Sequence, residues 1–211
     1  GALAVGMFLA LRARRPLVAA GCGLLSGLTR PTGLLLAVPA AIELFRPLPR
    51  GGRQWALRSL AVASPLLGTG CYLLWCAAAY GRPLLPYTVQ TRTDLRGAWL
   101  ANPVAGLLRG GDGGLDWRPT LLLVGAALAL AVVVARRLPL AYLAWTVLML
   151  GAAMTSSHGH SAPRYLAAAF PLLIAAGLVT RSRLAFGLSL AACAGGFAVL
   201  AGLGFTSSYV P

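Results

Sequence analysis

The feature that most constrains this chain is a series of long apolar runs that arginines separate from one another. A helix that crosses a membrane needs about 20 predominantly apolar residues, and several of these runs approach that length. Of the 211 residues, 58% are hydrophobic and 10% are charged, which is more apolar than a soluble domain requires. The sequence therefore predicts an all-α, polytopic transmembrane helix bundle. We expect its helical runs at 1–11, 17–28, 34–45, 55–80, 119–135, 140–154, 165–179 and 184–205.

The net charge of +14 arises from eighteen arginines, no lysine and four acidic residues. A strongly basic chain can bind nucleic acid. Here, however, the arginines lie between apolar runs and do not form one continuous face. They indicate membrane topology and contact with lipid phosphates, so we expect the lipid bilayer as a partner and no nucleic acid.

The arginines also predict the orientation of the chain. Arginine clusters beside short apolar runs mark the cytoplasmic side, and alternation assigns the remaining segments. Eleven arginines then fall on the cytoplasmic side: Arg12, Arg14, Arg15, Arg46, Arg50, Arg53, Arg58, Arg136, Arg137, Arg181 and Arg183. The other seven fall on the outer side: Arg30, Arg82, Arg92, Arg96, Arg109, Arg118 and Arg164. A site for a phosphorylated ligand on the outer side would account for them, because arginine binds phosphate through paired hydrogen bonds.

We expect a single transmembrane domain over 1–211, within which 81–118 forms an extracytoplasmic loop. The chain starts inside an apolar run and without methionine, so we interpret it as the C-terminal portion of a longer protein. It contains no cofactor motif, and we expect neither a cofactor nor a metal. The four cysteines lie in apolar runs and are expected to be small core residues: Cys22, Cys71, Cys76 and Cys193.

The most informative stretch runs from Thr29 to Gly33, where Arg30, a proline and a glycine interrupt two apolar runs. Each run has about twelve residues, or about 18 Å as a helix, which is too short to cross a membrane alone. We expect a broken-helix hairpin whose turn points towards the outer half of the membrane. Arginine at that depth costs roughly 3 kcal/mol and indicates a functional site; the alternative is a loop arginine that reaches the lipid headgroups. Gly23 and Gly27 would let another helix approach closely.

A second polar stretch, 158–165, ends in Pro163, Arg164 and Tyr165 and leads into an apolar helix. Pro163 suits the start of that helix. Arg164 would lie in its first turn, close to unpaired backbone donors that attract anions. Arg30 and Arg164 are therefore candidates to clamp a lipid-linked phosphate. The alternative for Arg164 is an arginine at the headgroup level that starts a helix.

The remaining polar residues indicate less chemistry. His158 and His160 have no third ligand nearby, so a metal site is not expected. One of the histidines can instead be a proton carrier or a hydrogen-bond donor near the site. Glu43 and Arg46 are three residues apart and are expected to pair on one helix without a chemical role.

Three motifs carry a resemblance to a known family. The first is Leu-Thr-Arg-Pro-Thr-Gly at 28–33, followed by an apolar arm that ends in Glu43. The second is Ser-x-Pro-Arg-Tyr at 161–165 with Phe-Pro-Leu at 170–172. The third and weaker motif is Gly-x-Pro-Leu at 81–84 with Gln90. Together they resemble the PIG-V type of GPI mannosyltransferase-like enzymes, and especially the bacterial relatives of that type.

The resemblance implies an integral-membrane glycosyltransferase of the GT-C class in the bacterial plasma membrane. Such enzymes move a sugar, typically mannose, from a polyprenyl-phosphate donor to an acceptor on the extracytoplasmic side. The acceptor, whether glycan, lipid or protein, does not follow from the motifs. Arg30 and Arg164 would bind the donor phosphate. The substrate contacts would come from Thr29, Thr32, Gln90, Trp99, His160 and Tyr165.

Two departures and two rival functions qualify the resemblance. The acidic residue that such enzymes use as a catalytic base would precede Gly1, so the fragment alone is expected to be inactive. Relatives often have an acid before the Pro-Leu pair of the middle loop, where this chain has Arg82. The rivals are a transporter or flippase for a lipid-linked anion and a non-catalytic membrane scaffold. Broken helices in both halves would favour the transporter, and the sequence shows one clear break.

Overall fold

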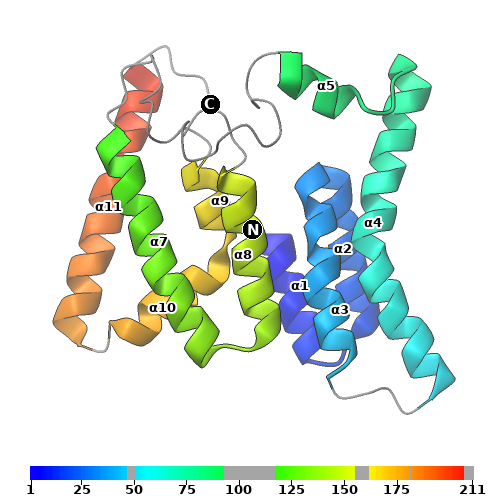
Figure 1. The fold of residues 1–211 in the computed structure, drawn as a ribbon, viewed down its shortest axis with the longest axis horizontal. Helices are drawn as coiled ribbons and strands as arrows, with labels where there is room; N and C mark the ends of the chain where they lie inside the picture. The colour runs from blue at the N-terminus through cyan, green and yellow to red at the C-terminus, as the bar shows by residue number, and fades with distance from the viewer. Residues whose placement is uncertain (47–50, 93–116, 155–161, 181, 207–211) are drawn as a thin grey trace.

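The computed structural model describes residues 1–46, 51–92, 117–154, 162–180 and 182–206. As expected, the regular elements in these ranges are all helical, and no strand occurs among them. The first half contains α1 (Ala2–Arg12), α2 (Pro16–Thr29), the 3-10 helix η1 (Pro31–Leu36), α3 (Ala37–Leu44), α4 (Gly52–Tyr80) and α5 (Leu85–Arg92). The second half contains α7 (Trp117–Arg137), α8 (Leu140–Met154), α9 (Ala162–Ala168), α10 (Phe170–Val179) and α11 (Arg183–Thr206) (Figure 1).

Most helix bounds follow the apolar runs of the sequence. Helix α8 has the expected bounds, and α4 contains the whole expected run 55–80. Helices α1, α2, α3 and α4 alternate in direction along the bundle, as do α7 and α8, and α11 runs opposite to α7 (Figure 1). The ends of α1 and α7 and the starts of α4 and α11 therefore lie towards one end of the bundle.

Helices α2 and α4 pack against each other through glycines. A Cβ added at Gly27 would overlap the carbonyl oxygen of Pro65 and lie 2.7 Å from the amide nitrogen of Thr69. A Cβ at Gly68 would overlap the carbonyl oxygen of Leu24. The two backbones therefore touch, and the helices run parallel because the paired positions increase together. This confirms the close helix approach that the glycine spacing predicts.

The expected interruption between Thr29 and Gly33 is present, although most of it is helical. Within it, Arg30 alone leaves the helical conformation, with φ −150° and ψ 136° between α2 and η1. Its carbonyl oxygen accepts a hydrogen bond from the Gly33 amide at 2.8 Å. A Cβ at Gly33 would overlap the carbonyl oxygen of Ser26 and lie 2.8 Å from the amide nitrogen of Gly27. Glycine at this position therefore allows η1 to turn back onto α2.

The sequence predicts one helix over 165–179, and this prediction is wrong. Ala169, with φ −78° and ψ 60°, separates α9 from α10. Pro171 lies in the first turn of α10 and has no amide hydrogen with which to continue α9. The indole nitrogen of Trp145 donates to the carbonyl oxygen of Ala168 at 3.1 Å and so satisfies an acceptor at the end of α9. The chain changes direction at this second interruption (Figure 1).

Aromatic side chains connect the two halves of the bundle. The ring of Phe8 on α1 lies 5.0 Å from that of Tyr142 on α8 and 5.1 Å from that of Phe170 on α10, between centroids. The rings are tilted or edge-on to one another, which is the favourable geometry for aromatic pairs. This cluster lies within the hydrophobic core and ties α10 to α1.

Helix α4 is the one helix in the described part of the chain that is long and apolar enough to cross a membrane. Shorter apolar helical stretches of 10–17 residues accompany it. Large hydrophobic side chains are exposed on several helices, among them Leu9 at 63%, Leu74 at 70% and Leu184 at 74%. Exposed apolar surface on this scale marks contact with a membrane or with another apolar partner.

Candidate functional site

Helix α2 has an arginine at each end, and each end forms a candidate site. Arg15 is the N-cap of this helix and Arg30 is its C-cap. The 14 residues of the helix span about 21 Å at 1.5 Å per residue. The two sites are therefore separate, and they differ in what surrounds the arginines.

The first site is the interruption at Arg30. The Arg30 amide donates to the carbonyl oxygen of Ser26 at 3.2 Å and closes the last turn of α2. The side chain is exposed, and no hydrogen bond or ion pair holds it within the described residues. The neighbouring Thr29 hydroxyl donates to the same Ser26 oxygen at 3.0 Å. The guanidinium group is thus available to a ligand, whereas the hydroxyl proton of Thr29 is used within its own helix.

Arg30 is set back from the far end of α4. The Thr69 hydroxyl of α4 donates to the Pro65 carbonyl oxygen of its own helix at 3.0 Å and lies 3.5 Å from the Gly27 carbonyl oxygen of α2, so Thr69 and Gly27 are at the same height. Since the helices are parallel, Arg30 lies near the level of Tyr72. Helix α4 continues to Tyr80, about 12 Å beyond that level. Arg30 therefore lies below the end of the longest described helix.

Aromatic side chains occupy α4 between this level and the helix end. The rings of Tyr72 and Trp75 stack at 6.1 Å, and those of Trp75 and Tyr80 pack edge-on at 5.6 Å, between centroids. Trp75 and Tyr80 are 55% and 58% exposed. Clustered Trp and Tyr at the end of an apolar helix are typical of a membrane–water interface.

The structure places the second predicted phosphate ligand only by its backbone. Arg164 lies in the first turn of α9, as expected, and its side chain is outside the described part. Figure 1 shows α9 and the C-terminal end of α2 in the same half of the bundle. The distance between the guanidinium groups of Arg30 and Arg164 stays a prediction.

The structure describes the side chains of three of the six predicted substrate contacts. Thr29 and Thr32 flank Arg30, and Thr32 is half-buried in η1. Tyr165 is half-buried and packs against the hydrophobic core. The backbone of Gln90 lies in α5, and its side chain is not described. Two further residues and most of the predicted loop lie outside the described residues, namely Trp99, His160 and 93–116.

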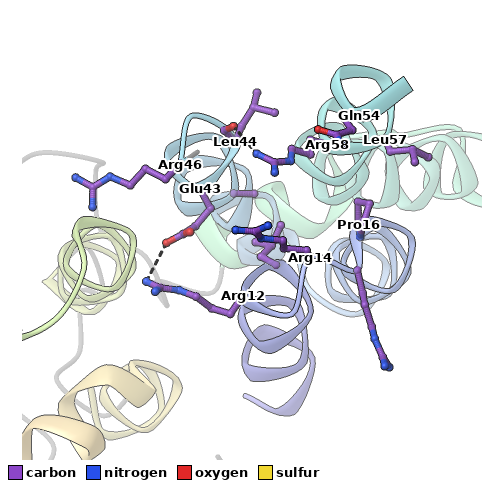
Figure 2. A pocket seen from close by; sticks show the side chains of 12 residues that line it. Arg12, Arg14, Pro16, Glu43, Leu44, Arg46, Gln54, Leu57 and Arg58 are labelled. Atoms are coloured by element: carbon purple, nitrogen blue, oxygen red, sulfur yellow. Dashed lines mark hydrogen bonds and ion pairs between the residues drawn. The ribbon is translucent and has the colours of Figure 1, made fainter. Parts of the chain in front are cut away.

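The second site is a pocket at the other end of α2, which the sequence analysis did not predict as a site. Its volume is about 730 Å³, and it lies between the ends of α1 and α3 and the starts of α2 and α4 (Figure 2). We call it the arginine pocket, because its charged lining residues are Arg12, Arg14, Arg15, Arg46, Arg58 and Glu43. The arginine cluster at residues 12–15 was the sequence signal that could have indicated this pocket. It was interpreted as a sign of membrane topology alone.

Glu43 forms an ion pair across helices in this pocket. Its Oε1 accepts a hydrogen bond from Nη2 of Arg12 at 3.1 Å. The predicted pair of Glu43 with Arg46 is wrong, because α3 ends at Leu44 and Arg46 extends away from the carboxylate (Figure 2). Arg12 also lies over the ring of Tyr142, 5.3 Å from its centroid. Glu43 is the one carboxylate among the residues that the structure describes.

Arg14 adopts an uncommon backbone conformation beside this ion pair. Its φ is 57°, and no other non-glycine residue of the described part has a positive φ. The amides of Arg14 and Arg15 donate to the carbonyl oxygens of Leu11 at 3.1 Å and Ala10 at 2.8 Å. This pattern is the Schellman helix end, in which glycine usually occupies the position of Arg14. A side chain at that position costs about 1–2 kcal/mol.

Comparison with protein-family models, with curated proteins and with solved structures found no match for this chain. The resemblance to mannosyltransferases therefore depends on the sequence motifs alone.

Proposed function

We propose that the protein is an integral-membrane glycosyltransferase of the GT-C type. It would transfer a sugar, with mannose as the first candidate, from a polyprenyl-phosphate donor to an acceptor on the extracytoplasmic side. The observation that carries the proposal is the exposed Arg30 at the break between α2 and η1, about 12 Å below the end of α4. An arginine at membrane depth is costly, which indicates a ligand of opposite charge. The donor phosphate is such a ligand.

The membrane part of the proposal is supported by α4 and by the exposed apolar surface. Trp55 lies near the start of α4 and Tyr80 at its end. Helical rise separates them by about 37 Å, which matches a bilayer of about 40–45 Å including its headgroup regions. Exposed leucines on α1 and α11 support further contact with lipid, as a multi-pass protein requires.

In the proposed reaction, an acceptor hydroxyl oxygen attacks the anomeric carbon of the sugar. The bond from that carbon to the phosphate oxygen breaks, and both bonding electrons leave with the polyprenyl phosphate. Arg30 stabilises the charge that develops on the phosphate through two parallel N–H donors. Arg164 would supply a second guanidinium group from α9. No described residue is assigned as the base that takes the hydroxyl proton.

The second interruption, at Ala169, favours a second candidate, a transporter or flippase for a lipid-linked anion. Discontinuous helices in both halves are typical of secondary transporters, whose substrate sites lie between the halves. Arg30 would then bind the phosphate without cleavage of any bond. The two candidates predict different products from the same ligand.

An assay of both products with the full-length protein in proteoliposomes separates the candidates. The ligand is polyprenyl-phosphate mannose labelled in the sugar, with a membrane extract of the source organism as the acceptor. Label that moves to the acceptor, and that fails to move in Arg30→Ala, supports the glycosyltransferase. Movement of the intact donor between leaflets without transfer contradicts it and supports the transporter. Absence of both activities would contradict both candidates and would favour the remaining alternative, a non-catalytic membrane scaffold.

A further inference from the structure

We propose that the arginine pocket is a second phosphate-binding site, which takes the phosphate group of an acidic phospholipid or of a soluble phosphorylated compound. The site does not depend on sugar transfer, because it lies at the opposite end of α2 from Arg30. About 21 Å of helix separates the two, which is too far for one phosphate to contact both.

The charge of the pocket is the first observation. Five arginines line it, and its one carboxylate, Glu43, is already bound to Arg12 at 3.1 Å. The Glu43 side chain is 10% exposed, so this ion pair forms part of the pocket wall. Arg14, Arg15 and Arg46 have no ion-pair partner within the described residues. Like charges on one cavity repel one another, and an anion between them removes that repulsion.

The second observation is the convergence of arginines from different helices. Arg58 on α4 donates through Nη1 to the carbonyl oxygen of Leu44 at 3.2 Å, which holds its guanidinium group at the end of α3. Figure 2 shows Arg14 and Arg58 between α1, α3 and α4, whereas Arg46 extends outwards. Guanidinium groups that approach from two directions can hold several oxygens of one phosphate.

The backbone of Arg14 is an independent observation. Its φ of 57° is a conformation that glycine adopts more easily, and the Schellman end of α1 needs no side chain there. Within the described residues, no protein group binds the Arg14 side chain. A residue that keeps an unfavourable backbone conformation, and whose side chain has no protein partner among the described residues, points to a ligand outside the protein.

Membrane topology alone does not account for these three observations. Arginines that only orient a helix need to be on the correct side, and they need not line a shared cavity. Arg136 and Arg137 at the end of α7 satisfy that requirement, are exposed, and do not line the pocket. They therefore provide a matched control for the arginines that do.

The test compares two variants of the full-length protein in an uncharged detergent. Arg14→Gly removes the side chain and permits the positive φ, whereas Arg137→Ala removes an arginine outside the pocket. The probes are phosphatidylglycerol and inorganic pyrophosphate, each titrated separately, with bound molecules counted by native mass spectrometry. We expect saturable binding of at least one probe, weakened at least about fivefold by Arg14→Gly and unchanged by Arg137→Ala. The unfolding midpoint of Arg14→Gly should equal or exceed that of the original protein, which a purely structural role would not predict.

Each pattern of binding has one interpretation. Phosphatidylglycerol alone identifies a lipid headgroup, pyrophosphate alone identifies a soluble phosphate, and both together identify recognition of the phosphate group itself. Absence of saturable binding by both probes overturns the proposal. Unchanged binding in Arg14→Gly, or an equal loss in Arg137→Ala, overturns it as well. Arg14→Asn also tolerates the positive φ, and it repeats the comparison if the glycine variant is poorly expressed.

Discussion

Arg30 and the arginine pocket mark the two ends of α2, and the structure around each end is held together differently. Near Arg30, backbones touch: Gly27 meets α4, and Gly33 lets η1 turn back onto α2. At the pocket, the contacts are charged or polar, with Arg12 bound to Glu43 and Arg58 bound to the end of α3. The helix packing near Arg30 therefore depends on close backbone contact, whereas the packing at the arginine pocket depends on charged and polar contacts.

This difference separates two uses of the same residue type. Arg30 is one exposed cation on a rigid and closely packed support, which suits stabilisation of charge at a defined position. The pocket gathers several cations on helix ends whose mutual repulsion is offset by a single carboxylate, which suits binding of an anion. Salt screens exposed charge pairs but leaves close backbone packing unaffected, so the two ends should respond differently to ionic strength.

The largest expected effect is the loss of sugar transfer in Arg30→Ala. Removal of one preorganised donor to developing charge costs about 2–4 kcal/mol of transition-state stabilisation, or roughly 30- to 1000-fold in rate. Arg30→Lys should recover only part of the rate, because lysine keeps the charge and loses the planar pair of donors. The rate of transfer from polyprenyl-phosphate mannose by the full-length variants measures both.

The matched control for Arg30 is Arg137→Ala, which removes an exposed arginine from the end of α7. We expect it to transfer sugar at the rate of the original protein. An equal loss in both variants would mean that net charge matters and that the position of Arg30 does not.

The next largest effect is expected on stability, at the contact between α2 and α4 near Arg30. Gly27→Ala places a Cβ against the backbone of α4, 2.7 Å from the Thr69 nitrogen, and should destabilise the fold by about 1–3 kcal/mol or more. Gly21→Ala on the same helix meets no atom within 4 Å and should be neutral or stabilising by up to about 1 kcal/mol. The unfolding midpoint in detergent compares the two variants. Equal midpoints would contradict the contact between α2 and α4.

The smallest effect on stability is expected at the arginine pocket. Glu43→Gln keeps the shape of the side chain and removes its charge, which should cost about 0.5–1 kcal/mol of stability, because Arg12 is 42% exposed. The loss should shrink as salt is added, since screening already weakens the pair in the original protein. Unfolding midpoints at low and high salt measure this change. A loss that does not depend on salt would mean that Glu43 acts through packing.

The sequence predicted the parts of the fold that depend on local composition. Apolar length alone gave the bounds of α8, and the Arg-Pro-x-Gly pattern gave the break at Arg30. The break at Ala169 was missed although Pro171 was visible, because a proline within the first turn of a helix and one that ends the previous helix look alike in sequence.

The arginine pocket was beyond prediction for a different reason. Glu43 has Arg46 three residues away in the chain, and its ion pair is with Arg12, 31 residues away. Local spacing predicts pairs on one helix, whereas a pair between helices depends on how α1 and α3 pack. The positive φ of Arg14 had no local signal either, because glycine is the residue that normally indicates such a helix end.

The central proposal is that the two ends of α2 point towards opposite sides of a membrane, with Arg30 in its outer half. Cysteine labelling tests it most directly, in full-length protein whose four native cysteines are replaced by alanine. Arg82→Cys lies just beyond the end of α4, on the Arg30 side, and Arg137→Cys lies at the end of α7, on the side of the arginine pocket; both positions are exposed. We predict that a membrane-impermeant maleimide labels Arg82→Cys in intact cells and labels Arg137→Cys only after the cells are permeabilised. Labelling of Arg137→Cys in intact cells, with Arg82→Cys protected until permeabilisation, would place Arg30 on the cytoplasmic side and contradict the account.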